Sequence, residues 1–292
     1  MQDRDHGQPT PDIPFTPSKI AEGKTKIVWE TENPDVVRIE SKDDITAGDG
    51  ARHDILEGKA ELATTTTANV FKLLEAHGIS THFIAQDSPA TFLAKKVDMI
   101  QLECVARRIA TGSYLKRHPE VEEGQRFEVP VVEFYIKNDS FHDPIISYES
   151  KTKRIMVFDA KAPVVERSPI DDTRLENFGV TLEELDKMEQ LTRQMFVVIE
   201  KEWEKQKVLL EDGEEVPIVL ADMKGEFGRD NTNELILADV IDNDSWRIWP
   251  DGDKSKDISK QSYRNLKPGD DLNEVKKNYE LVAAMTERFI TV

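Results

Sequence analysis

Apolar and polar residues alternate in two short runs near the start of the chain. The runs are 20–30, which reads IAEGKTKIVWE, and 36–40, which reads VVRIE. Asn33-Pro34-Asp35 lies between them and has the composition of a tight turn. Side chains of a strand repeat every two residues, so the pattern predicts a β-hairpin. Apolar runs at 82–85 and 99–106 predict further strands, the second of them buried.

Apolar residues follow a helical spacing in the segment 59–76. Leu62, Val70, Leu73 and Leu74 fall on one side of the predicted helix, and Gly78 is expected to end it. Four consecutive threonines at 64–67 are weak helix formers in the middle of this segment.

A longer helix is predicted from Thr181 to about Lys205. Thr181-Leu182-Glu183-Glu184 has the pattern of a capping box, in which a threonine and a glutamate satisfy each other's backbone N–H groups. The apolar positions that follow have helical spacing and would form the buried stripe: Leu182, Leu185, Met188, Leu191, Met195, Val198 and Ile199. Asp271-Leu272-Asn273-Glu274 predicts the start of a final helix.

Two apolar runs in the second half of the chain carry charged residues. They are 217–228 and 236–242, with a turn between them. Alternation places Asp222, Lys224 and Glu226 on one face of a strand, and we expect Asp239 on the next strand. One interpretation is a solvated hairpin face with salt bridges. The other is a site that holds a divalent cation and a phosphate together, because magnesium takes carboxylate oxygens and shares substrate phosphates.

The order of these elements predicts an α+β protein of two lobes with a cleft between them. Residues 1–17 are polar with four prolines, and we expect a disordered tail. We expect an N-terminal lobe at 18–103 and a larger lobe at 104–292.

Residues 143–177 are polar with prolines at 144, 163 and 169, which predicts an irregular excursion over the surface. Residues 249–257 are expected to form a loop.

Composition excludes several classes of protein. Of 292 residues, 38% are hydrophobic and 33% are charged, as in globular proteins. A formal net charge of −18 argues against non-specific nucleic-acid binding, which needs a basic surface. No apolar run approaches the roughly 20 residues that cross a bilayer. The single cysteine, Cys104, excludes an internal disulfide, has apolar neighbours and predicts a buried thiol in a reducing cytoplasm.

Basic side chains recur beside glycine or other small residues. Lys24 and Lys26 follow Gly23 on a predicted strand, where they can reach the phosphates of a nucleotide, although the spacing is not that of a Walker A loop. Arg107 ends an apolar strand that leads to Gly112-Ser113. Arginine binds phosphate through two nitrogens, and a tight turn adds N–H and hydroxyl donors. The alternative interpretation of this second motif is a surface salt bridge and an ordinary helix cap.

Three further polar positions are candidates for a binding site. Asp49 lies between Gly48 and Gly50, in a loop that either closes over a ligand or only connects two elements. Lys137 begins the polar segment KNDSFHDP. Arg247 follows Asp244-Ser245-Trp246, beyond the two charged runs.

Together these motifs resemble those of the SAICAR synthetases, the phosphoribosylaminoimidazole-succinocarboxamide synthases of de novo purine synthesis. The resemblance covers residues 20–288 and rests on EGKTK, ITAGDGAR, RRIATGS, DMKGEFG and LADVIDNDSWR. KQSYR at 260–264 makes the chain most similar to the animal-type branch. The resemblance implies a SAICAR-synthase-like fold with an antiparallel β-rich N-terminal lobe, a larger α+β C-terminal lobe and ATP in the cleft between them.

The resemblance also implies a reaction. Family members join L-aspartate to the carboxylate of the imidazole nucleotide CAIR with ATP and Mg²⁺, and they give SAICAR, ADP and phosphate. ATP first converts the carboxylate into an acyl phosphate, which the aspartate amine then attacks. We therefore expect CAIR and L-aspartate as small-molecule partners, a cytoplasmic location, and neither nucleic acid nor membrane as a partner. A homo-oligomer is compatible with the sequence.

Matching the motifs position by position assigns the nucleotide side of the site by resemblance. Three lysines would contact the ATP phosphates, namely Lys24, Lys26 and Lys137. Met99 would lie beside the adenine, and the two carboxylates of Glu226 and Asp239 would hold Mg²⁺ next to the nucleotide.

The same matching assigns the CAIR side of the site. Arg107, Ser113 and Arg247 would hold the phosphate of CAIR, and Asp49 would lie in a loop that borders the substrate. Asp222 and Lys224 would lie near the imidazole and its carboxylate. The catalytic candidates are Lys224, Asp222 and Lys137. The resemblance does not assign the aspartate pocket.

Four positions depart from the family pattern. Met223 replaces an aromatic residue, and Gly225 replaces a bulky aliphatic residue beside Glu226. Gln101 stands where proline is frequent, and Ser259 replaces an acid.

The sequence leaves two other functions open. A small-molecule kinase of related architecture, such as an inositol polyphosphate kinase, would share the ATP and metal residues. A catalytically inactive binding module would keep the fold without the reaction. The ligase is favoured because Arg107, Ser113 and Arg247 imply a single phosphate monoester on the acceptor substrate.

Overall fold

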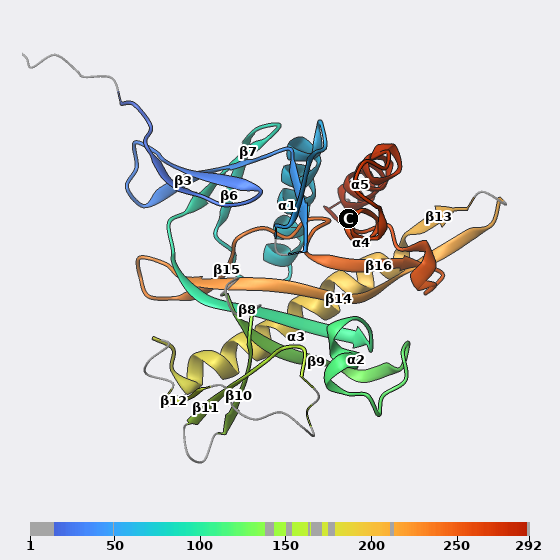
Figure 1. The fold of residues 1–292 in the computed structure, drawn as a ribbon. Coiled ribbons are helices and arrows are strands. Elements are labelled where there is room, and N and C mark those ends of the chain that lie inside the picture. The colour runs from blue at the N-terminus through green and yellow to red at the C-terminus, as the bar shows by residue number, and fades with distance from the viewer. Residues whose placement is uncertain are drawn as a thin grey trace, which may run out of the picture.

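Two antiparallel sheets carry most of the fold, and helices pack against them (Figure 1). The computed structural model describes residues 15–48, 50–137, 143–149, 154–162, 164, 171–174, 179–210 and 213–290. Of the expected disordered tail, residues 1–14 lie outside the described residues. The mixture of helices and antiparallel sheets confirms the α+β prediction.

The first sheet contains the predicted hairpin. Its strand order is β1-β2-β3-β7-β6, with bounds β1 Lys19–Glu22, β2 Lys26–Glu30, β3 Val36–Ser41, β7 Thr91–Lys95 and β6 Phe83–Ser88. Residues 19–30 contain two strands, β1 and β2, because the chain reverses at Gly23, whose N–H donates to the Lys26 carbonyl at 2.9 Å. In a separate pair, β4 Asp44–Ala47 and β5 Arg52–Ile55, the two strands lie on either side of Gly48 and Gly50 in the sequence.

The second sheet is built around two long strands, β8 Asp98–Ile109 and β14 Glu215–Arg229, which pair with each other. Its order is β12-β11-β10-β9-β8-β14-β13, and β15 and β16 also pair with β14. The remaining bounds are β9 Arg126–Ile136, β10 Ile145–Glu149, β11 Arg154–Phe158, β12 Asp171–Arg174, β13 Lys207–Leu209, β15 Leu235–Ala238 and β16 Trp246–Pro250.

The prediction of an irregular excursion at 143–177 was wrong for much of its described part. Strands β10, β11 and β12 extend the second sheet beyond β9. Ile145, Ile155 and Val157 are buried. The apolar alternation around them is short and is interrupted by prolines and polar residues, so the sequence did not indicate strands. The loop predicted at 249–257 also begins too early, because Trp249 and Pro250 belong to β16 and pair with β14.

Helix α1, Lys59–Ala76, has the predicted bounds, and Gly78 follows it with φ +77°. The threonines that weaken its helix propensity are largely buried. The Thr64 hydroxyl is 2.8 Å from that of Ser41, and the Thr67 hydroxyl donates to the Ile241 carbonyl at 3.3 Å. Packing and hydrogen bonding therefore outweigh the low propensity of these residues.

Helix α3, Leu182–Lys205, confirms the predicted capping box. The Glu184 N–H donates to the Thr181 hydroxyl at 3.1 Å, and the Thr181 N–H donates to the Glu184 carboxylate at 2.8 Å. The hydrogen bond from Arg229, at the end of β14, lowers the pKa of Glu184 to about 2.

The other helices are α2 Ser113–Arg117, α4 Gln261–Asn265 and α5 Asn273–Thr286, with short 3₁₀ turns at Lys254–Lys256 and Glu287–Ile290.

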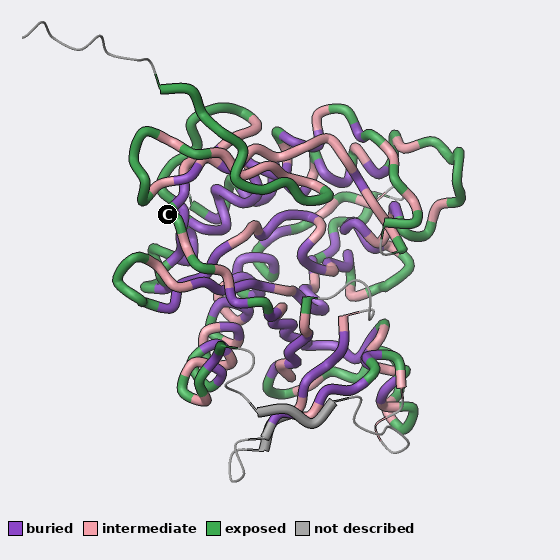
Figure 2. The backbone as a smooth tube through the Cα atoms, turned by 60° about the vertical axis from the view of Figure 1, so that its left-hand side comes forward, coloured by how far each residue is buried: buried purple, intermediate pink, exposed green. Residues whose placement is uncertain are grey.

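One apolar core joins the two sheets. It contains Phe71 of α1 and Phe92 of β7 at the first sheet, and Phe196 and Trp203 of α3 at the second. Figure 2 shows buried residues along the central elements and exposed residues mainly on the outer loops. Cys104 is buried in this core as predicted, and burial raises the pKa of its thiol. Within the described part of the chain, every helix is too short or too polar to span a membrane.

The core explains why glycine occupies position 225. A Cβ atom built on Gly225 would lie 2.3 Å from Cε of Met195 and 3.3 Å from Cδ1 of Leu237. Met195, on α3, is fully buried and fills the space that a larger side chain at position 225 would need. Gly225 therefore replaces the bulky aliphatic residue of the family, and the long, flexible side chain of Met195 on α3 fills the space instead.

We expect Met195→Ala to lower the free energy of unfolding by about 2–5 kcal/mol, because it leaves a cavity against Gly225. Adding Gly225→Val to Met195→Ala should recover part of that loss, whereas Gly225→Val alone should destabilise the protein. Chemical denaturation of the four proteins in this double-mutant cycle measures the coupling. Equal costs of Gly225→Val in both backgrounds would show that Met195 does not compensate for the glycine.

Candidate active site

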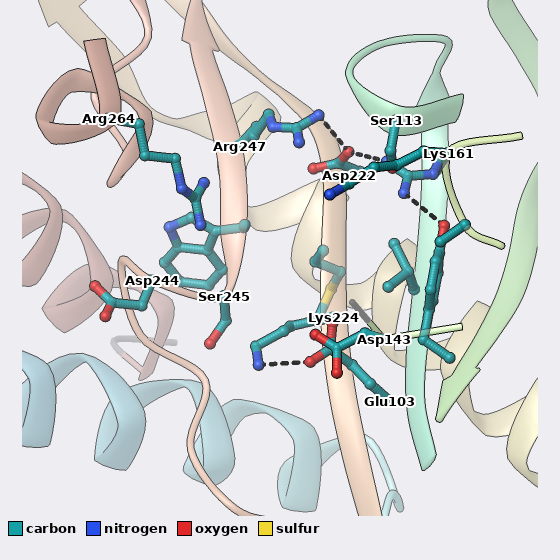
Figure 3. A pocket seen from close by; sticks show the side chains of 16 residues that line it. Glu103, Ser113, Asp143, Lys161, Asp222, Lys224, Asp244, Ser245, Arg247 and Arg264 are labelled. Carbon is teal, nitrogen blue, oxygen red and sulfur yellow. Dashed lines mark hydrogen bonds and ion pairs between the residues drawn. The ribbon is translucent and has the colours of Figure 1, made fainter. Parts of the chain in front are cut away.

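A cavity of about 260 Å³ opens beside the central strands of the second sheet (Figure 3). It contains five of the residues predicted to bind substrate or to act in catalysis: Arg107, Ser113, Asp222, Lys224 and Arg247. The other lining residues are Glu103, Val105, Tyr135, Asp143, Ala160, Lys161, Met223, Asp244, Ser245, Trp246 and Arg264. The fold thus brings together residues from β8, β14 and β16 that are distant in sequence.

Two guanidinium groups meet at Asp222 at one end of the cavity. The Asp222 carboxylate accepts from Arg107 Nη1 at 2.5 Å and from Arg247 Nη1 at 2.9 Å. Both arginines are backbone partners of Asp222 in the sheet, one on β8 and one on β16. Figure 3 shows Ser113 and Lys161 beside this carboxylate. An anion at this end would meet several cations and a hydroxyl group.

Gly112 lets Arg247 lie against the turn that precedes Ser113. Its φ is +62°, and a Cβ atom there would be 2.7 Å from Arg247 Nη1. Glycine is therefore needed both for the left-handed backbone and for the close approach of the guanidinium. Both interpretations of the Gly-Ser motif hold, because Gly112 is the N-cap residue of α2 and Ser113, the first residue of that helix, lines the cavity.

Besides Asp222, Arg107 is held by an acid that the sequence analysis did not assign to the site. It is 4% exposed, and its Nε donates to Glu133 at 2.7 Å. Arg117 donates to the same carboxylate, and both arginines reach the Tyr135 hydroxyl. Although burial disfavours its charge, Asp222 and Glu133 raise the pKa of Arg107. Glu133 and Tyr135 are two residues apart on β9, a spacing that could have indicated a shared polar face.

A second cluster of charges surrounds Glu226, which is 3% exposed. Its carboxylate accepts from Lys137 at 2.5 Å and lies 3.6 Å from Nζ of Lys224. Lys224 also donates to Glu103 at 2.9 Å. Burial and the neighbouring Asp239 raise the pKa of Glu226. Although burial opposes its charge, Glu103 and Glu226 raise the pKa of Lys224, so this lysine is a cation at neutral pH.

Asp239 lies next to this cluster and makes an ion pair with Lys26 of the first sheet. It follows the last residue of β15, whereas we expected it on the strand itself. Glu226 pairs with Ala238, the residue before Asp239, which brings the two acids close together. Although burial raises the pKa of Asp239, Lys26 and Lys224 hold it below its usual range.

The two carboxylates are the candidate ligands for a metal. Among the described residues there is no group of three or more histidine, cysteine or acidic side chains that could enclose a metal ion. Magnesium is commonly held by only one or two carboxylates together with substrate phosphates and water. Glu226 and Asp239 are hard oxygen donors in mutual repulsion, so this pair fits a magnesium ion shared with a phosphate.

The remaining predicted residues are placed outside the cavity or are not described. Lys24 lies between β1 and β2, with its side chain close to Gly50. Met99 is on β8, opposite Gly228 of β14. Asp49 lies outside the described residues. The roles assigned to these three residues stay predictions.

A buried ion network supports another wall of the cavity. Asp244 accepts from Nζ of Lys260 at 2.8 Å and from the Tyr279 hydroxyl, and Nζ of Lys59 is 3.6 Å away. These partners come from α1, from the start of α4 and from α5. Although burial opposes its charge, Lys59 and Lys260 hold the pKa of Asp244 low. The sequence contained no local signal that these four residues meet.

Comparison with known proteins agrees over nearly the whole chain. The family model described as SAICAR synthetase matches residues 19–285. The phosphoribosylaminoimidazole-succinocarboxamide synthase of Roseiflexus castenholzii is 42% identical over 275 residues, which cover 93% of this chain and 97% of that protein. The multifunctional protein ADE2 of Gallus gallus is also 42% identical, over 92% of this chain and 58% of its own length.

Solved structures show the same fold. The synthase from Ehrlichia chaffeensis has a TM-score of 0.74 and 30% identity, and the match covers 92% of this chain and 98% of that one. A SAICAR synthetase in complex with ADP has a TM-score of 0.70 and 31% identity, with 91% and 96% covered.

These matches do not support the narrower expectation of an animal-type branch. Bacterial synthases without the additional length of the chicken protein match this chain at the same identity. The family itself is shown by the extent of the match. Because residues 19–285 include both sheets and every residue that lines the cavity, the chain belongs to the SAICAR synthetase family.

Proposed function

We propose that the protein is an ATP-dependent ligase that joins L-aspartate to the carboxylate of CAIR and gives SAICAR, ADP and phosphate. The observation that carries this proposal is the charge arrangement on one face of β14. Asp222 gathers two guanidinium groups at one end of the cavity, and Lys224 and Glu226 lie further along the same strand. Such a face can bind a phosphate monoester at one end and place a second phosphate group near the other.

The chemistry explains why cations dominate the site. A carboxylate does not accept an amine at neutral pH, because oxide would have to leave. In the proposed first step, a carboxylate oxygen of CAIR bonds to the γ-phosphorus of ATP and ADP leaves. In the second step, the amine nitrogen of aspartate bonds to the acyl carbon, phosphate leaves and the nitrogen loses a proton. The protein has to position the reactants and neutralise charge, which requires no covalent nucleophile.

On the nucleotide side, Lys24, Lys26 and Lys137 would contact the ATP phosphates and Met99 would lie near the adenine. Lys26 and Lys137 already hold the carboxylates of Asp239 and Glu226, so both ammonium groups point into the acidic cluster. A SAICAR synthetase of the same fold is known in complex with ADP, which supports a nucleotide as a ligand.

Glu226 and Asp239 are the residues that would hold magnesium. When bound, magnesium neutralises charge on the phosphoryl group that is transferred. The two carboxylates supply hard oxygen ligands, and burial together with the neighbouring charge of Asp239 raises the pKa of Glu226. In this proposal Lys137 stays near the metal and contacts the phosphoryl group.

On the CAIR side, Arg107, Ser113 and Arg247 would bind the phosphate, and Asp222 would orient both guanidinium groups. Lys224 is a cation next to Glu103 and Glu226, so it would stabilise the negative charge of the carboxylate and of the acyl phosphate, and it would not act as a base.

The proposed lobes are 18–103 and 104–292, with ATP between them. The boundary falls within β8, the strand that leads from the first sheet into the second. We also retain the predictions of a cytoplasmic enzyme without nucleic-acid or membrane partners, which rest on the net charge of −18 and the absence of long apolar runs in the sequence. The border role of Asp49 and the presence of a homo-oligomer stay predictions too.

Purified protein incubated with ATP, Mg²⁺, CAIR and L-aspartate should form SAICAR and release ADP only when all components are present. Chromatography of the nucleotides measures both products. ADP release that does not depend on aspartate would favour a kinase. Glu226→Gln and Asp239→Asn should abolish the reaction, and full activity in both variants would contradict the assigned metal ligands.

Arg247→Ala should raise the KM for CAIR by about 10–100-fold, because it removes a charge-assisted hydrogen bond of about 1.5–3 kcal/mol. The KM for ATP should change by less than about threefold. Arg193→Ala on α3 is the matched control, because Arg193 pairs with Glu189 of the same helix and lies outside the cavity. Equal effects of Arg247→Ala on both substrates would refute its place at the CAIR phosphate.

Lys26→Ala should instead weaken nucleotide binding by about tenfold and leave the KM for CAIR nearly unchanged. The expected loss follows from removal of one ammonium–phosphate contact of about 1.5 kcal/mol. Isothermal titration with ADP and Mg²⁺ measures the affinity directly. Lys19→Ala on β1 serves as the control, since Lys19 pairs with Glu22 at the surface. An unchanged affinity for ADP in the Lys26 variant would contradict the assignment.

A further inference from the structure

Asp239 has an unusual backbone conformation for a residue with a functional side chain. Its φ is +62°, in the left-handed region. For a residue other than glycine this conformation costs about 1–2 kcal/mol, and it persists where the surroundings impose it. The conformation matters here because it occurs at the residue that turns its carboxylate toward Lys26 at the end of β15.

The segment between α1 and β6 lies against the end of β15. Leu237 N–H donates to the Ser80 carbonyl at 3.1 Å, and His82 N–H donates to the Leu237 carbonyl at 2.9 Å. Thr81 and Leu237 form a parallel bridge. A short segment next to the first sheet therefore runs beside β15 and holds Leu237, two residues before Asp239.

The His82 side chain completes this support. Its Nε2 atom is 2.8 Å from the backbone carbonyl oxygen of Asp239. A carbonyl oxygen can only accept a hydrogen bond, so Nε2 carries the hydrogen. The imidazole is 2% exposed and lies edge-on to the rings of Phe71 and Phe92, at centroid distances of 5.6 Å and 5.8 Å. This packing leaves the ring little freedom to move away from Asp239.

We propose that His82 is a positioning residue that holds Asp239 in the left-handed conformation and thereby aims its carboxylate at the magnesium site. The inference rests on the proposed function, in which Asp239 is a metal ligand. Without the Nε2 donor, the carbonyl of Asp239 loses its partner, and the backbone is free to return to a more common conformation. The carboxylate then no longer lies beside Glu226, and a metal bound by both acids loses one ligand. Mutation of a residue that hydrogen-bonds to a metal ligand typically lowers the metal affinity by about 10–100-fold.

The alternative is that the imidazole only fills the core. In that case its removal would lower stability without changing the metal affinity of the folded protein. Two polar replacements separate these roles. A glutamine side chain can bring its amide nitrogen to the position of Nε2, because the same number of bonds separates each atom from the backbone. Asparagine is one bond shorter and cannot reach, so His82→Asn is the matched control for His82→Gln.

The experiment measures Mn²⁺ binding by electron paramagnetic resonance in the presence of ADP, on the full chain. We expect His82→Leu and His82→Asn to raise the dissociation constant for Mn²⁺ about tenfold or more, and His82→Gln to stay within about threefold of the unmodified protein. The KM for CAIR should be unchanged in all three. Thermal unfolding without metal gives the stability of each variant independently.

Each outcome decides the proposal. Unaltered Mn²⁺ affinity in His82→Leu or His82→Asn, at any loss of stability, would overturn the role of His82 and leave the proposed function intact. If the unmodified protein binds no Mn²⁺ with ADP, the assignment of Asp239 as a ligand is wrong and the inference falls with it. If His82→Leu does not fold, the comparison of the glutamine and asparagine variants decides: equal metal affinity of these two would also overturn the inference.

Discussion

The structure depends on the pairing of buried carboxylates with cations along one face of β14. Asp222 and Glu226 are less than a tenth exposed, and each is in contact with two cationic side chains. Removing one partner of a buried ion pair typically costs about 3–5 kcal/mol, because the remaining charge is left without compensation. The acids therefore keep the arginines and lysines in place before any substrate arrives. The same cations are then available to an anionic ligand without a large rearrangement.

This pairing also ties distant parts of the chain to the cavity. Lys26 comes from the first sheet, Lys137 follows β9, and Arg247 lies on β16. Each reaches an acid on or beside β14, so the charge arrangement depends on how the two sheets are packed together. The continuous apolar core provides that packing, and α3 covers the central strands on the side where Met195 fills the space at Gly225. Stability and binding geometry are thus parts of one arrangement.

Prediction from sequence succeeded where the information is local. The capping box at Thr181 and the end of α1 near Gly78 depend on residues within a few positions of each other, and both were confirmed. It failed at 143–177, where prolines and polar residues concealed the short strands β10 to β12. It did not identify Glu133 or Tyr279 as part of the ion networks, because their partners lie on other elements.

The sequence by itself determined which side chains of β14 share a face, because alternation along a strand needs no information from the rest of the molecule. Its motifs also determined the family, which the comparisons confirm. Only the tertiary structure decided which cation meets which carboxylate, that Asp239 takes a left-handed conformation, and that His82 lies behind it. These contacts join residues far apart in the chain. They are set by strand register and by the packing of the lobes, which no local pattern of residues specifies.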